Sequence, residues 1–223
     1  MKFADGISRL GTETAFEVLA KAKALEAEGK SIIHLQIGEP DFPTPKNICD
    51  AAVRSIQAGD THYTGAAGTP ELRKTIAEYV SRTRGVDFTA DNVVMTPGAK
   101  PIMFFLILAL LQHGDEAMYP NPGFPIYESM INFTGAKAVP IPLTQENNFN
   151  IDLKEFEKNV TDKTRLVIIN TPGNPTGKTI PRKDIEALAE ILKNRDCMIL
   201  SDEIYSRICY DGAESFSISK LPG

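Results

Sequence analysis

Apolar residues along the chain recur at two different spacings. Spacings of three to four residues from Phe16 onward, with a stop signal at Gly29, predict an amphipathic helix over about 14–28. The same pattern predicts further helices near 46–58, 70–84, 126–133, 153–158 and 181–194. The run IMFFLILALL at 102–111 is apolar on every side and predicts a buried helix after Gly98. Short apolar runs predict strands at 31–35, 92–96, 116–120, 138–143, 165–170 and 197–203.

These elements alternate between strand and helix along most of the chain. Strands that are apolar on both faces, such as LVII at 166–169, are typical of parallel sheets that helices cover on both sides. We therefore expect an α/β fold with a mainly parallel sheet flanked by helices. The proline-rich stretch GEPDFPTP at 38–45 breaks the composition and indicates a crossover between two parts of the structure.

Composition and charge exclude several classes of function. The 223 residues are 42% hydrophobic and carry a formal net charge of −5 without a basic cluster, which argues against a nucleic-acid surface. Cys49, Cys197 and Cys209 are too scattered for a metal site or a disulfide framework, so we expect no metal and a reducing compartment. The run at 102–111 is too short to cross a bilayer, and the opening MKFADG does not resemble a secretory signal. A cytoplasmic location without membrane contact is expected.

Four unusual turns each follow a predicted strand. They are TPGAK at 96–100, PNPGFPIY at 120–127, NTPGNPTG at 170–177 and SDEIY at 201–205. Ligands of open parallel sheets bind beyond the carboxyl ends of the strands, and these ends share one edge of the sheet. The four turns therefore predict a single site.

Each turn has a chemical interpretation and a plainer one. TPGAK puts glycine before a helix whose first amides can bind a phosphate, although a glycine at such a turn needs no ligand. Phe124 can stack on a flat ligand or fill the core. Asp202 can pair with a cationic nitrogen of a ligand or cap the next turn. A cis Asn174–Pro175 bond would give the Asn174 side chain a particular orientation. The plainer interpretation is that this turn merely connects two elements.

Together these turns supply a phosphate cradle, a stacking ring, groups for a phenolic oxygen and a carboxylate for a protonated ring nitrogen. This inventory fits pyridoxal phosphate. With IGEPDFPTP at 37–45, THYTGAAGTPELR at 61–73 and SDEIYSRICYDG at 201–212, the motifs stand in an order that strongly resembles class I, aspartate-aminotransferase-like aminotransferases. The resemblance implies the large domain of fold type I and pyridoxal 5′-phosphate as cofactor.

The resemblance also implies roles for the residues that would surround the cofactor ring. Phe124 would stack on the pyridine, and Asp202 would keep its nitrogen protonated. Asn174 and Tyr205 would bond the ring oxygen O3′.

Further roles concern the phosphate and the substrate. The resemblance implies that the amides of Gly98, Ala99 and Lys100 bind the phosphate. Tyr63 would reach the phosphate of the neighbouring subunit in a homodimer. Gly38, together with Asn174, would contact the substrate.

The family's Schiff-base lysine follows the SDEIY segment by a few dozen residues, and the chain ends at Gly223. Lys220 lies too close to Asp202 and is expected to be a solvated surface lysine, and Lys100 belongs to the phosphate loop. No catalytic residue is therefore assigned within the chain. We expect residues 1–40 to form an N-terminal helix and arm that contribute to a small domain, and 41–223 to form an incomplete cofactor-binding large domain.

The expected function is transfer of an amino group between an amino acid and a 2-oxo acid, by a protein of which this chain is the N-terminal portion. Without the downstream lysine, the chain alone is not expected to be active. A C–S lyase of the same fold is an alternative, because the ring contacts are shared. A non-catalytic fragment that binds pyridoxal phosphate is another. The substrate's identity is open, and Phe16 is expected to fill core rather than line a side-chain pocket.

Overall fold

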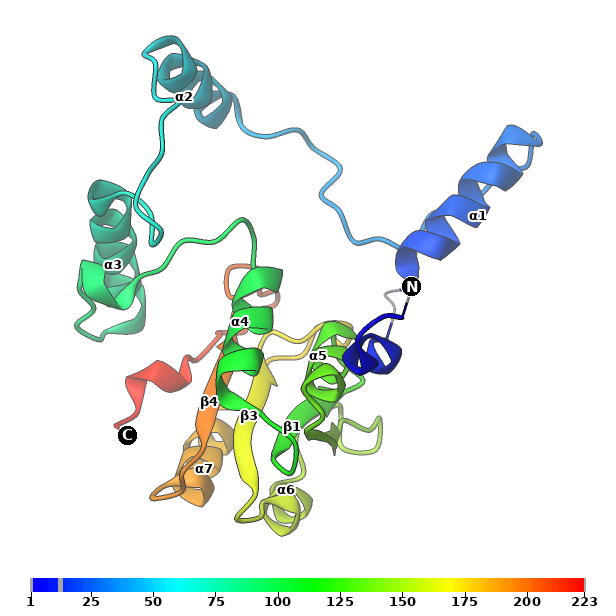
Figure 1. The fold of residues 1–223 in the computed structure, drawn as a ribbon, viewed down its shortest axis with the longest axis vertical. Helices are drawn as coiled ribbons and strands as arrows, with labels where there is room; N and C mark the ends of the chain where they lie inside the picture. The colour runs from blue at the N-terminus through cyan, green and yellow to red at the C-terminus, as the bar shows by residue number, and fades with distance from the viewer. Residues whose placement is uncertain (1, 12–13, 223) are drawn as a thin grey trace.

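The computed structural model describes residues 2–11 and 14–222 and has a four-stranded parallel sheet at its centre (Figure 1). The strand order is β2-β1-β3-β4. The strands are β1 (Glu116–Asn121), β2 (Lys137–Pro142), β3 (Thr164–Asn170) and β4 (Met198–Asp202). The predicted α/β fold with a mainly parallel sheet is therefore confirmed.

Some helices pack against this sheet, and others lie away from it (Figure 1). The α-helices are α1 (Ala15–Ala27), α2 (Lys46–Gln57), α3 (Pro70–Arg84), α4 (Lys100–Leu110), α5 (Ile126–Thr134), α6 (Leu153–Asn159) and α7 (Arg182–Leu192). The described residues also form three short 3-10 helices, η1 (Asp5–Arg9), η2 (Ala90–Asn92) and η3 (Ile218–Lys220). Most helix bounds lie within a few residues of those that the apolar spacing predicted.

Side chains that alternate along the central strands fill two separate cores. Leu166 and Ile168 of β3 pack with residues of α4 and α5 on one face. Val167 and Ile169 point to the other face, where residues of α6 and α7 cover them. This alternation follows from the two-residue period of a strand, and it explains why β3 is an unbroken apolar run. The sheet is thus the middle of three layers, between α4 and α5 on one face and α6 and α7 on the other, and this packing holds the carboxyl ends of the strands in place.

Two predicted strands, at 31–35 and 92–96, are wrong, since neither segment is a strand. Ile33 and Leu35 are almost fully exposed, and Val94 is also exposed. A strand is stable only when its backbone pairs with a neighbour. In the second segment, the Met95 amide instead donates to the Ala67 carbonyl over 3.0 Å.

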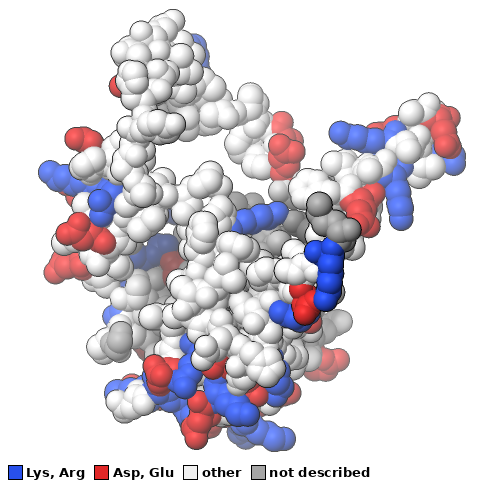
Figure 2. Space-filling model, viewed as in Figure 1, with Lys and Arg blue, Asp and Glu red and all other residues white. Residues whose placement is uncertain are grey.

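The apolar helix α4 is buried on one side only. Met103 and Ile107 face the core, whereas Phe105 and Leu108 are exposed, so the prediction of a fully buried helix is wrong. The sheet covers a single face of α4, and the surface over the helix carries little charge (Figure 2). The expectation that Phe16 fills core is also wrong, because 57% of this residue is exposed.

Helices α1 and α2 lie away from the sheet, and residues 30–45 between them form neither helix nor strand (Figure 1). The predicted boundary near residue 40 falls within this extended stretch and stays a prediction. No helix of the described residues is long and apolar enough to span a membrane.

Candidate functional site

All four turns contribute residues to one cavity at the carboxyl edge of the sheet, and the turn at 96–100 does so at the start of α4. The cavity has a volume of about 160 Å³. Its lining residues are Ala99, Lys100, Met103, Phe124, Tyr127, Asn170, Asn174, Asp202, Ile204 and Tyr205. Residues of the four turns therefore line one cavity, and its role as a binding site stays a prediction.

Asp202 ends β4 and is 8% exposed. Its Oδ2 accepts a hydrogen bond of 2.6 Å from the Tyr127 hydroxyl, and its Oδ1 accepts one of 3.3 Å from the Ile204 amide. One carboxylate oxygen thus caps the following turn, as the plainer interpretation expected. The same carboxylate also lines the cavity, where it can face a cationic group of a ligand.

Sequence reasoning missed Tyr127, which is fully buried in the first turn of α5. Burial, followed by the hydrogen bond to Asp202, raises the pKa of its hydroxyl above the ordinary value, so the hydroxyl stays protonated and donates. Its ring meets that of Phe124 edge to face, with 5.8 Å between centroids. Residues three apart share one side of a helical turn, so the spacing of FPIY could have indicated this pair.

Asn170, which sequence reasoning also left out, organises the turn that carries Asn174. Its side-chain Nδ2 donates to the Asp202 carbonyl over 3.0 Å, and its Oδ1 accepts from the Asn174 amide over 2.7 Å. The Asn174–Pro175 bond is cis, as the interpretation of an aimed Asn174 required. These contacts join the ends of β3 and β4, which pair at Asn170 and Asp202.

The turn before α4 carries the amides that were predicted to bind a phosphate, and that role stays a prediction. Gly98 has a φ of 89°, a conformation that favours glycine, and its own amide donates to the Thr96 carbonyl over 2.8 Å. The helix starts at Lys100, and both Lys100 and its N-cap Ala99 line the cavity. The Lys100 ammonium lies 5.5 Å from the centroid of the Phe124 ring.

Tyr205 lines the cavity, whereas three of the predicted residues, Gly98, Tyr63 and Gly38, are not part of its lining. Tyr63 is fully exposed, and Gly38 has no heavy atom within 4 Å of the position that a Cβ would take. Their predicted roles stay predictions. Lys220 is exposed, with its ammonium 5.7 Å from the ring of Phe216, as expected of a surface lysine.

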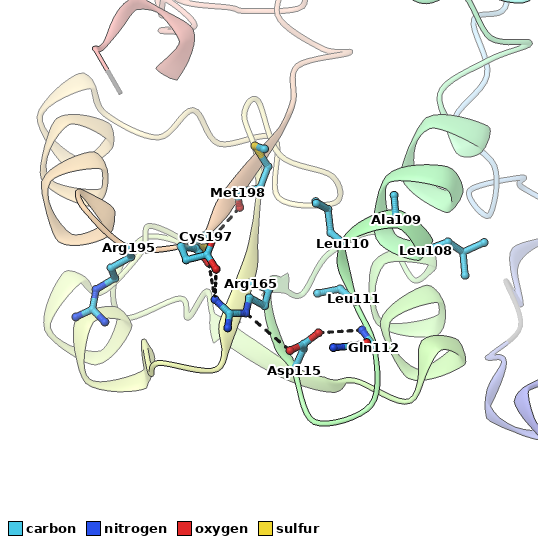
Figure 3. Close-up of a pocket in the computed structure, with 11 residues that line it drawn as sticks. Leu108, Ala109, Leu110, Leu111, Gln112, Asp115, Arg165, Arg195, Cys197 and Met198 are labelled. Atoms are coloured by element: carbon cyan, nitrogen blue, oxygen red, sulfur yellow. Dashed lines mark hydrogen bonds and ion pairs between the residues drawn. The ribbon is translucent and has the colours of Figure 1, made fainter.

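A second cavity, of about 660 Å³, lies at the opposite end of β3 and β4 (Figure 3). Arg165 forms ion pairs there with Asp115 at 3.8 Å and Asp196 at 2.6 Å. Burial raises the pKa of the neighbouring Cys197 thiol to about 11, which keeps it protonated and unreactive. None of the four motif turns lines this cavity, so it is not the candidate site. Among the described residues, no group of three or more His, Cys, Asp or Glu could hold a metal ion.

Comparison with known proteins gives consistent matches. Residues 30–221 match the family described as aminotransferase class I and II. An aspartate aminotransferase of Bacillus sp. (strain YM-2) is 38% identical over 218 residues, which are 98% of this chain and 56% of that protein. The chain thus spans about half the length of the curated relatives it matches.

Two solved structures share the fold. The Thermus thermophilus aspartate aminotransferase with maleate superimposes with a TM-score of 0.94 at 34% identity, covering 99% of this chain and 57% of that one. A Pyrococcus furiosus alanine aminotransferase gives a TM-score of 0.93 at 32% identity, with coverage of 100% and 57%. At these identities the likeness concerns family as well as fold.

Proposed function

The chain belongs to the class I and II aminotransferases, and on this premise we propose that it provides most of the cofactor site of an enzyme that moves an amino group between an amino acid and a 2-oxo acid. Pyridoxal 5′-phosphate is the cofactor of this family. The observation that carries the proposal is the buried Asp202 carboxylate, which ends β4 at the cavity and is held there by Tyr127.

The residues around the cavity fit this cofactor by their chemistry. A carboxylate, an aromatic face, an amide and a phenol converge on a space of about 160 Å³ next to a helix start. Asp202 would face the ring nitrogen, and Phe124 the flat face of the ring. Asn174 and Tyr205 would donate to O3′, and the amides of Gly98, Ala99 and Lys100 would bind the phosphate, although that of Gly98 also bonds Thr96.

When bound, pyridoxal phosphate supplies an electron sink that stabilises the negative charge left on the substrate Cα once its proton is removed. Asp202 holds a proton at the ring nitrogen, since a buried carboxylate is stabilised by a cationic partner. Tyr127 fixes the orientation of that carboxylate with its 2.6 Å hydrogen bond. Phe124 excludes water from one side of the cavity.

The substrate is proposed by class alone. The names of the relatives specify aspartate and alanine, which differ in side chain but share the α-amino acid group. Gly38 and Asn174 would contact that shared group. We further propose a cytoplasmic homodimer in which Tyr63 serves the neighbouring site; the full exposure of Tyr63 and its absence from the cavity lining support this role.

The test is the Asp202→Asn variant, because asparagine keeps the shape of the side chain and removes its charge. Amino transfer by the complete natural protein should slow by at least about 100-fold, or roughly 2.7 kcal/mol of barrier. N-methyl pyridoxal phosphate, whose ring nitrogen is permanently cationic, should recover part of the loss. Asp162→Asn, at an exposed position before β3, is the matched control.

Near-normal transfer by Asp202→Asn, or no recovery with the methylated cofactor, would make Asp202 a structural cap. Release of pyruvate and ammonia without keto-acid-dependent transfer would instead indicate the C–S lyase chemistry.

A further inference from the structure

Glu203 is the acidic residue of SDEIY that the proposed chemistry leaves unused. It lies between Asp202 and Tyr205, but it does not line the cavity that those two residues share with Ile204. Its side chain is nevertheless only 13% exposed. A carboxylate in such a position is stable only if other groups of the protein compensate its charge.

Three polar groups satisfy this carboxylate from three separate parts of the chain. Oε2 pairs with the guanidinium of Arg84. Oε1 accepts hydrogen bonds from the hydroxyls of Ser201, at 2.9 Å, and Ser217, at 2.6 Å. Arg84 is the last residue of α3, Ser201 belongs to β4, and Ser217 is the N-cap of η3. The Glu203 side chain is therefore the point at which these segments are joined.

A second contact strengthens the link between α3 and the turn. The Arg207 guanidinium donates to the Tyr79 hydroxyl over 2.9 Å and lies 5.6 Å from the centroid of its ring. Both contacts attach α3 to residues just after Asp202. Within the turn itself, the Ser206 amide donates to the Glu203 carbonyl over 3.0 Å. The backbone around Tyr205 is thus held by a hydrogen bond within the turn and by the ion pair between Glu203 and Arg84 of α3.

We infer that Glu203 is a positioning residue, which fixes the turn so that Asp202 and Tyr205 face the cofactor in a single orientation. This inference rests on the proposed function, since it assigns Glu203 a role through the two residues that would contact the ring. Asp202 directly precedes Glu203, and Tyr205 follows two residues later, so a shift of the Glu203 backbone moves both groups. Loss of the carboxylate therefore affects the ring nitrogen and O3′ together.

The experiment measures binding of pyridoxine 5′-phosphate, which carries the phosphate, ring nitrogen and O3′ but no aldehyde and so binds without a covalent bond. Glu203→Gln should raise its Kd about tenfold. The near-UV absorbance of the bound ligand, which reports ionisation of the ring nitrogen and O3′, should shift in its pH titration. Glu190→Gln is the matched control, because Glu190 forms an exposed ion pair with Lys193 on α7; it should change neither quantity.

A double variant separates positioning from simple loss of stability. Arg84→Gln combined with Glu203→Gln leaves no buried unpaired charge, so thermal unfolding should return toward that of the unaltered chain. The weaker binding and the spectral shift should persist, because the double variant still lacks the ion pair that attaches the turn to α3. Return of both binding and spectrum to the unaltered values would overturn the inference, as would a Glu203→Gln variant that binds like Glu190→Gln. The binding is measured on the complete natural protein, and failure of its unaltered form to bind pyridoxine 5′-phosphate would instead overturn the proposed function, and this inference with it.

Discussion

Replacing Tyr127 by phenylalanine removes one hydroxyl and leaves the packing of its ring intact. The hydroxyl donates to Asp202, and the ring keeps its edge contact with Phe124, so no cavity larger than one oxygen atom is created. A hydrogen bond to a charged group contributes about 1.5 to 3 kcal/mol. The free energy of unfolding should fall by that amount at pH 7, which for a chain of this size corresponds to roughly 3 to 12 °C in Tm.

The pH dependence of this loss tests its cause. Burial raises the pKa of Tyr127 above the ordinary value of 10.0, so the folded state retains a proton that the unfolded state releases. Its contribution to stability is fully present below pH 10 and is lost as the pH rises from there toward the folded-state pKa. The difference between the unaltered chain and Tyr127→Phe should therefore shrink between pH 9 and 11. Tyr119, whose pKa is raised to about 12, remains in both chains and affects them equally.

Urea unfolding followed by far-UV circular dichroism at pH 7, 9 and 11 provides the measurement. Tyr210→Phe is the control, because Tyr210 is 75% exposed and its hydroxyl should contribute little. A difference below about 0.5 kcal/mol at pH 7 would show that the hydroxyl contributes no more than an ordinary surface group. A difference that is the same at all three pH values would refute the assignment to ionisation of Tyr127.

Two further variants test other parts of the structure. Glu116 accepts from Lys137 Nζ at 2.9 Å and from the Thr161 hydroxyl at 2.7 Å, and these bonds lower its pKa below 4.5. Glu116→Gln should therefore lower the free energy of unfolding by about 1.5 to 3 kcal/mol at pH 7. Urea unfolding should show that this difference from the unaltered chain disappears as the pH falls through the lowered pKa of Glu116. A difference that stays constant down to pH 2 would contradict this. Tyr63→Phe should weaken binding of pyridoxine 5′-phosphate about tenfold only at protein concentrations at which analytical ultracentrifugation finds dimers. An equal loss in the monomer would place Tyr63 in its own subunit's site.

The sequence alone determined the four strands of the sheet and the place of the candidate cavity. Strands β1 and β3 lie within one residue of their predicted bounds, because burial on both faces leaves a mainly apolar stretch, AMYP in β1 and LVII in β3, which can be recognised without knowledge of neighbouring strands. The site followed from the same logic. Parallel strands that end in unusual turns must present those turns at one edge, so the order of strands and turns along the chain was enough to bring Phe124, Asn174, Asp202 and Tyr205 together.

Tertiary structure decided which polar groups pair across the chain. The partner of Asp202 lies 75 residues away in sequence, and nothing in the local pattern of either segment specifies that contact. The same holds for Glu203, whose side chain pairs with Arg84, more than 100 residues earlier in the sequence. The segments at 31–35 and 92–96 have strand-like composition without a strand, since apolar residues record a tendency to be buried, whereas a strand forms only where another backbone lies alongside it.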